Sequence, residues 1–158
     1  SIRIQLIPHI KHTVFSGDIH SPTPNDRLCL ALTSSADSQR IQDSCHVWLQ
    51  QQAQRDFQTR ITRFLYSCDY AHRFRQLRLS SPSKRWGSCS SHGTIMLNWR
   101  LIHFKPAIID YVVAHEVAHL KELNHSPVFW QEVERLLPDF YTARQQLKLF
   151  SPNTLPLF

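Results

Sequence analysis

The sequence predicts a mixed fold, with short strands and long helices in separate stretches of one domain. Apolar and polar residues alternate from Ile2 to Leu6, which is the period of a half-buried strand. From residue 38 to 66, apolar residues recur at helical spacing, and a strongly apolar helix is expected after Pro106. A chain of 158 residues can bury a core as a single unit, so we expect one domain over residues 1–158.

The N-terminal part, residues 1–37, is expected to be rich in strands. Strands are predicted over Ile2–Leu6, Thr13–Phe15 and Arg27–Thr33, and two prolines mark residues 21–26 as a loop. A polar linker at residues 34–38 then supplies candidate N-caps for the helix over residues 38–66. The apolar face of this long helix predicts a structural role, in which the helix backs a sheet.

The third part, residues 73–150, is expected to hold a short sheet, an apolar helix and C-terminal helices. Strands are predicted over Arg73–Leu79 and Thr94–Leu101, with a turn at residues 80–83. Gly87 and Gly93 are two of only three glycines, which indicates positions that need a positive φ or a close approach. We expect a mostly antiparallel sheet, backed by the long helix. The tail, residues 151–158, is not assigned.

The apolar helix after Pro106 carries the strongest chemical signal in the chain. Proline suits the first helical position because it has no N–H to leave unpaired. His115, Glu116 and His119 lie among apolar residues as H-E-x-x-H, which places both histidines on one face of a helix. Burying such groups without partners costs roughly 2–7 kcal/mol each. A metal ion bound by the two imidazoles, with Glu116 beside it, resolves that conflict.

A catalytic zinc site needs a third protein ligand, and His125 is the preferred candidate. It precedes Ser126-Pro127, an N-cap and first-turn pair that begins a new helix. We expect the chain to reverse at Asn124, which tolerates a left-handed conformation, so that His125 returns to the face of His115 and His119. Glu132 and Glu134 on the following helix stay open as alternative ligands.

Charge and hydropathy indicate the partners to be expected. The net charge is +6 and the pI near 9.5, and basic residues gather between Arg55 and Lys105, so nucleic acid is a candidate partner there. A solvated basic surface explains the same pattern. No apolar run reaches the ~20 residues of a membrane span, and no signal peptide opens the chain, so we expect a cytoplasmic protein without a membrane partner.

Four runs of residues resemble the YgjP-like metallopeptidase domain, a family of predicted zinc-dependent hydrolases similar to the SprT-like and Wss1-like proteases. They are Lys84–Ser90, Leu97–Leu101, Asp110–Leu120 and Asn124–Trp130. The resemblance covers about residues 80–140 and implies a small zincin-type α+β fold. It also implies one zinc ion held by His115, His119 and His125, with Glu116 as the catalytic residue.

The resulting hypothesis is a zinc peptidase that acts on peptides or proteins, with Glu116 as general base. Asp110 is a candidate for supporting the metal ligands or capping the helix, and Trp86 for contacting substrate. Asn98 and Arg85 are candidate oxyanion donors, and the strand from Thr94 could pair with an extended peptide. Cys89 is expected to be a structural thiol rather than a nucleophile. A zinc hydrolase of a non-peptide substrate, and a nucleic-acid-associated module with a structural metal, are the alternatives.

Overall fold

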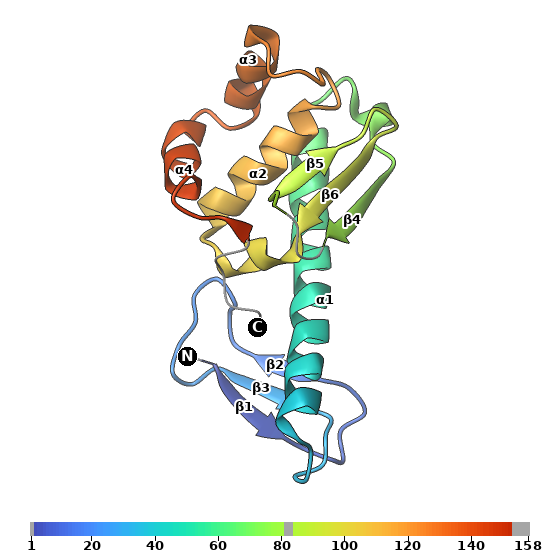
Figure 1. Cartoon of the computed structure of the whole chain (residues 1–158), viewed down its shortest axis with the longest axis vertical. Coiled ribbons are helices and arrows are strands. Elements are labelled where there is room, and N and C mark those ends of the chain that lie inside the picture. The colour runs from blue at the N-terminus through green and yellow to red at the C-terminus, as the bar shows by residue number, and fades with distance from the viewer. Residues whose placement is uncertain (1, 81–83, 153–158) are drawn as a thin grey trace. The chain divides into compact units, whose positions relative to one another are not determined.

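The computed structural model confirms an α+β fold and describes residues 2–80 and 84–152 (Figure 1). Most of the turn expected at residues 80–83 and most of the tail, residues 151–158, therefore lie outside the described residues. The chain forms two compact units, Ser1–Leu49 and Gln50–Leu157, and the boundary between them falls within the long helix.

The first unit is a small mixed sheet that packs on the start of the long helix. Its strands are β1 (Arg3–Leu6), β2 (Val14–Ser16) and β3 (Arg27–Leu30), in the order β1-β3-β2. β3 runs parallel to β1 and antiparallel to β2. Leu28, Leu30 and Trp48 form its buried core, and the rings of Phe15 and Trp48 lie 4.9 Å apart.

The long helix, α1 (Ser38–Leu65), matches the helix predicted over residues 38–66. The side chain of Asp37 accepts a hydrogen bond from the Arg40 N–H at 2.8 Å, which satisfies one free donor of the first turn. In the second unit the helix buries Phe57 and Ile61 completely. Its apolar face therefore has the structural role that the spacing predicts.

The sheet of the second unit differs from the expected, mostly antiparallel one. β4 (Gln76–Ser80), β5 (Gly87–Cys89) and β6 (Thr94–Asn98) are ordered β4-β6-β5, with β4 parallel and β5 antiparallel to β6. Alternation along a strand identifies its two faces but not the direction of its neighbour. β6 is paired on both edges, so the expectation that it offers an edge to a peptide is wrong, and β5 is the edge strand beside it.

Two short 3-10 helices flank this sheet where longer strands are expected. Ala71–Arg73 form η1, and Trp99–His103 form η2. β6 ends at Asn98 because the side-chain oxygen of Asn98 accepts a hydrogen bond from the Arg100 N–H and so begins η2. Ile95 and Leu97, on one face of β6, are completely buried, whereas Met96 on the other face is exposed.

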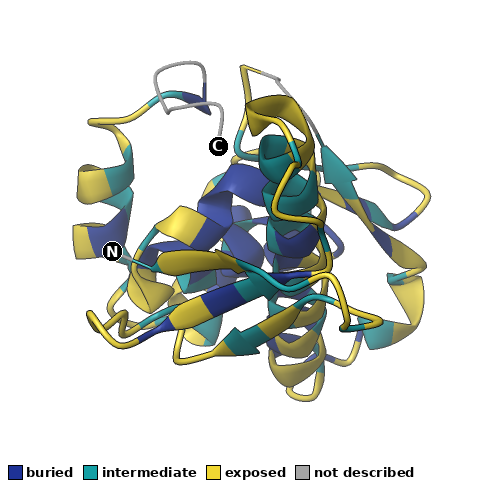
Figure 2. Cartoon of the chain, turned by 90° about the horizontal axis from the view of Figure 1, so that it is seen from below, coloured by how far each residue is buried: buried dark blue, intermediate teal, exposed yellow. Residues whose placement is uncertain are grey.

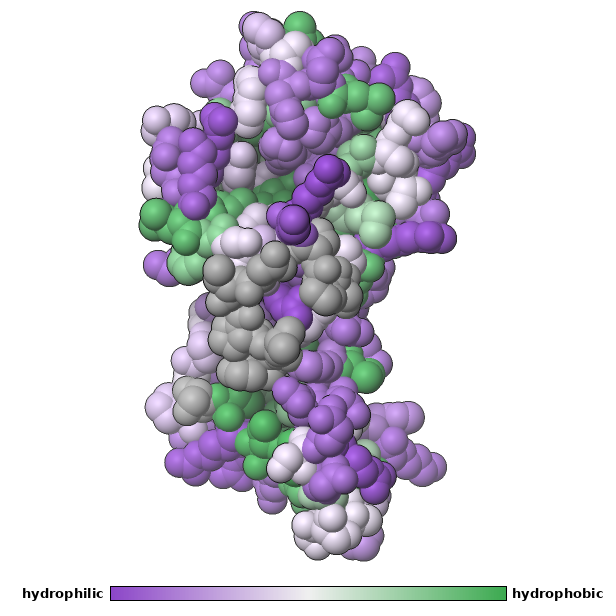
Figure 3. Space-filling model, viewed as in Figure 1, coloured by the Kyte–Doolittle hydropathy of each residue, from purple (hydrophilic) through white to green (hydrophobic). Residues whose placement is uncertain are grey.

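The remaining helices are α2 (Pro106–Ala118), α3 (Pro127–Leu136) and α4 (Phe140–Leu147). α2 begins at the predicted proline, contacts β5, β6, α3 and α4, and is buried along most of its length (Figure 2). Among the described residues no helix combines the length and apolar character of a membrane span. On the face in Figure 3, hydrophobic residues show as small patches among hydrophilic ones.

Candidate metal centre

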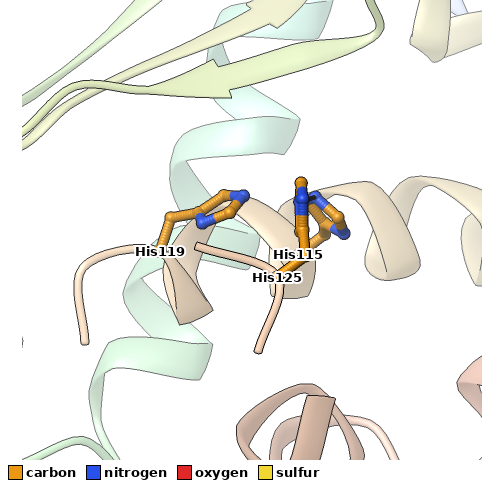
Figure 4. Close-up of side chains that lie close together, drawn as sticks. All are labelled: His115, His119 and His125. Carbon is orange, nitrogen blue, oxygen red and sulfur yellow. Dashed lines mark hydrogen bonds between the residues drawn. The ribbon is translucent and has the colours of Figure 1, made fainter. Parts of the chain in front are cut away.

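Three histidines of the second unit converge at the C-terminal end of α2. His115 lies in the last turn of α2, His119 follows its end, and His125 comes from the loop before α3 (Figure 4). One nitrogen from each imidazole lies within 4.8 Å of the others, and the Nε2 atoms of His115 and His125 are 3.2 Å apart. The structure thus brings together the three residues that the sequence proposes as metal ligands.

The turn that returns His125 to α2 differs from the expected one. No residue other than glycine has a positive φ in the described ranges, so Asn124 is not left-handed. Instead, its side-chain Oδ1 accepts a hydrogen bond from the Ser126 N–H at 3.1 Å. Asparagine reverses the chain here by its side-chain hydrogen bond, which is the other way this residue stabilises turns. Ser126 then caps α3, as predicted.

The environment of His115 and His119 favours neutral imidazoles, the form that binds metal. Burial, together with the neighbouring His119 and His125, lowers the pKa of His115 to about 3. Burial also lowers the pKa of His119, whose Nδ1 lies 3.0 Å from the carbonyl oxygen of Glu122. An Nδ1–H that donates to this carbonyl leaves the Nε2 lone pair of His119 free. The facing Nε2 atoms of His115 and His125 can share a proton, which a divalent cation can replace.

Phe129 packs against all three imidazoles, a contact that the sequence analysis did not identify. Its ring centroid lies 4.9 Å from that of His115, 4.4 Å from that of His119 and 4.9 Å from that of His125. Phe129 is completely buried on the first turn of α3. Because α3 begins directly after His125, this phenylalanine fixes the loop histidine against the two from α2. Phe129 lies three residues after the Ser126 N-cap, and this spacing is the sequence signal that could have identified the contact.

Glu116 is buried beside β5, and no described residue hydrogen-bonds its Oε2 atom. Burial raises the pKa of its carboxyl to about 8, against the opposing effect of the positively charged Arg85. A Cβ at Gly87 would lie 2.6 Å from Oε1 and 2.9 Å from Cγ of Glu116. Gly87 therefore provides the close approach predicted for it, because only glycine leaves room for this carboxylate.

Arg85, Trp86 and Cys89 lie around β5, the strand that faces Glu116. Arg85 is exposed and acts on Glu116 through its charge. Trp86 packs edge-on against Phe104, with ring centroids 5.1 Å apart. Burial, aided by the negative charge of Glu116, raises the pKa of the Cys89 thiol to about 12. A thiol that stays protonated is a poor nucleophile, which favours the structural interpretation of Cys89.

Asp110 and Asn98 each accept hydrogen bonds from residues other than the three histidines. Asp110 accepts hydrogen bonds from Arg60 at 2.5 Å and from Arg63 at 2.6 Å, and so joins α2 to α1 within the second unit. The Oδ1 atom of Asn98 begins η2, as described above, while its Nδ2 is buried with no partner among the described residues. Asp110 is not part of the cluster that the histidines form.

The alternative ligand Glu132 is bound by other side chains. It accepts hydrogen bonds from Tyr70 at 2.5 Å, Lys121 at 3.1 Å and Arg135 at 2.5 Å. Burial favours its protonated form, yet the hydrogen bonds from Arg135, Tyr70 and Lys121 lower its pKa to about 2. Glu134, the other alternative, is exposed on α3. Among the described residues, only the three histidines form a metal-binding group.

The chain matches a family model and is similar to a solved structure. A family model described as the YgjP-like metallopeptidase domain matches residues 9–150. No curated protein matches the chain. Among solved structures, the chain is similar to the metallopeptidase zymogen abylysin from Pyrococcus abyssi, with 25% identity and a TM-score of 0.47. That similarity covers 56% of this chain and 92% of the other.

Proposed function

The chain belongs to the YgjP-like metallopeptidase family, and from this premise we propose that it is a zinc peptidase whose ion is held by His115, His119 and His125. Membership makes it a metal-dependent peptidase, with peptides or proteins as the suggested substrates. The observation that carries the proposal is the convergence of three imidazoles, of which that of His119 is buried, that of His115 half-buried and that of His125 exposed. Glu116, next to His115 in the sequence, is buried and has no partner for Oε2 among the described residues.

A set of three imidazoles fits zinc better than magnesium or calcium, which prefer oxygen ligands. The described part of the chain offers three ligands for one ion and no fourth, as in catalytic zinc sites that keep one position open. Structural zinc sites are usually closed by four protein ligands, often cysteines. This donor set therefore supports a catalytic ion rather than a structural one.

Zinc bound at this site supplies the chemistry of a Lewis acid, since it lowers the pKa of a coordinated water towards about 7 and polarises a carbonyl. Glu116 Oε2 is the group that takes the proton of the attacking water. The water oxygen bonds to the carbonyl carbon, the C–N bond breaks, and Glu116 returns the proton to the leaving amine nitrogen. The apolar wall formed by Phe129 excludes bulk water from one side of the imidazoles.

Three expectations from the sequence stay predictions: one domain over residues 1–158, nucleic-acid contact through residues 55–105, and a cytoplasmic location. The five residues Asp110, Asn98, Arg85, Trp86 and Cys89 also keep the roles proposed for them. The positive charge of Arg85 also favours the ionised form of Glu116 and so lowers the pKa of that carboxyl.

The Glu116→Gln variant tests the mechanism. Glutamine keeps the shape of the side chain but cannot take a proton, so we expect zinc binding to be retained and peptide hydrolysis to fall by about 10²–10⁴-fold. Glu134→Gln is the matched control, since Glu134 is exposed on α3, and its activity should equal that of the wild type. Unchanged hydrolysis in a zinc-loaded Glu116→Gln protein would show that another group moves the proton.

A further inference from the structure

A cavity of about 630 Å³ opens in the second unit beside His119, which forms part of its wall. The rest of the wall comes from three segments: the residues before β4, the turn between β5 and β6, and the residues that follow α2. Its volume lies within the range of small-ligand pockets, about 300–1,000 Å³. A group bound in this cavity is therefore next to one of the three proposed metal ligands.

Hydrogen bonds and a glycine hold these three segments together. The Arg75 N–H donates to the Gly93 carbonyl at 2.9 Å, and Arg73 Nη1 donates to the Leu120 carbonyl at 3.0 Å. Gly93 has a φ of +87°, and a Cβ there would overlap the Arg73 carbonyl oxygen and lie 3.1 Å from Arg75 Cγ. The wall is thus built from fixed backbone, and the guanidinium of Arg73 ties it to the segment that follows His119.

The wall of the cavity is positively charged. Arg73, Arg75 and Lys121 line it, while Glu122 is the one carboxylate among the lining residues. Lys121 shares its charge with Glu132 at 3.1 Å, whereas neither arginine forms an ion pair with any carboxylate of the described residues. Two guanidinium groups with free N–H donors favour a bound anion, and their planar shape matches a carboxylate.

On the basis of the proposed peptidase function, we infer that this cavity binds the carboxylate side chain of an aspartate or glutamate in the peptide substrate. Because His119 lines the cavity, the acidic residue stands within a few positions of the bond that is cleaved. The positively charged wall of the cavity thereby selects the site of cleavage, while the three histidines and Glu116 perform the hydrolysis. A neutral or basic side chain at the same substrate position leaves the two arginines without a partner.

Matched fluorogenic peptides test this inference on the zinc-loaded protein. The peptides carry Glu, Gln or Lys in turn at each of the positions flanking one cleavable bond. At one position we expect Glu to raise kcat/KM about 10-fold over Gln, which corresponds to the 1.4 kcal/mol of a favourable charge pair that is partly exposed. The Arg75→Gln variant should reduce that ratio to about 1–3-fold, and Arg75→Glu should favour Lys.

The control is Arg78→Gln, which removes an exposed arginine of β4 that does not line the cavity. It should keep both the rate and the preference for Glu. Equal cleavage of the Glu and Gln peptides at every position overturns the inference and leaves the peptidase function intact. A preference for Glu that survives both Arg73→Gln and Arg75→Gln overturns it as well. Failure to cleave any peptide contradicts the proposed function itself.

Discussion

Two buried glutamates of the second unit, Glu116 on α2 and Glu132 on α3, stand in opposite environments. They are 4% and 2% exposed, so burial alone does not distinguish them. Glu132 accepts hydrogen bonds from Tyr70, Lys121 and Arg135, and its pKa falls to about 2. Glu116 has no partner for Oε2 among the described residues, and burial raises its pKa to about 8.

This difference in hydrogen bonding indicates that Glu132 stabilises the fold and that Glu116 is available for chemistry. A buried ionised group that is fully hydrogen-bonded holds its neighbours in place, and removing it leaves their charges unpaired. A buried carboxylate with an open hydrogen-bonding site destabilises the fold, and such groups concentrate at functional sites. Glu116 lies next to the histidine triad in sequence, whereas Glu132 joins α3 to the segments around Tyr70 and Lys121.

After Glu116→Gln itself, the largest effect on Glu116 is expected from Gly87→Ala. The added methyl would lie 2.6 Å from Oε1, so the carboxylate must move away. A displacement of about 1 Å in a catalytic group costs roughly 100-fold in rate, which we expect for kcat/KM with zinc content unchanged. Ser88→Ala, one residue along the same strand, is the control, and an activity within about threefold of wild type is expected for it.

The stability of the Gly87→Ala variant distinguishes a role of Gly87 in packing from a role in positioning Glu116. If the variant loses activity only in proportion to the fraction of molecules that unfold, then Gly87 serves packing and does not position Glu116. Thermal unfolding of the same samples separates these outcomes, since a positioning role predicts the loss of activity in fully folded protein.

For Glu132, the second glutamate of the comparison, the Glu132→Gln variant should lower the free energy of unfolding by about 2 kcal/mol. It should leave the activity of the folded protein within a few-fold of wild type. Breaking fully buried ion pairs costs about 3–5 kcal/mol. The expected loss is smaller here because the side chains of Lys121 and Arg135 are 44% and 46% exposed and can be hydrated. Urea unfolding measures the change, and a variant as stable as wild type would show that the network contributes nothing.

Acid should weaken the Glu132 network, and this is the smallest of the expected effects. The pKa of Glu132 is about 2 in the folded protein and roughly 4.3 when unfolded, so the stabilisation is complete above about pH 4.3 and is lost as the pH falls towards 2. The difference in unfolding free energy between wild type and Glu132→Gln should therefore be smaller at about pH 3 than at about pH 6. A difference that grows on acidification would contradict the assigned pKa.

Local signals in the sequence predict the helices and the metal ligands. The start of α2 at Pro106, the Ser126 cap of α3 and the H-E-x-x-H spacing depend on residues close together in the chain, so they can be found without the fold. The close approach at Gly87 could also be expected, because glycine is rare in this chain.

Features that depend on distant residues could not be predicted in the same way. The parallel pairing of β4 with β6 places β6 at the centre of its sheet, although its sequence suits an edge equally well. From the sequence alone, Glu132 stayed a possible metal ligand. The hydrogen bond that it accepts from Tyr70 joins residues far apart in the chain, so it could not be predicted. In the sequence, Phe129 has the pattern of an ordinary core residue. Its contacts with the three imidazoles are seen only in the structure.

Zinc analysis of the purified wild type and of single His115→Ala, His119→Ala and His125→Ala variants tests the central claim most directly. We expect one zinc ion per wild-type chain, and zinc binding weakened by at least about 10-fold in each variant. The His20→Ala variant, which removes a histidine of the first unit, should bind zinc as wild type does. A wild-type protein that binds no zinc, or a His125→Ala variant that binds it unchanged, would contradict the three-histidine centre.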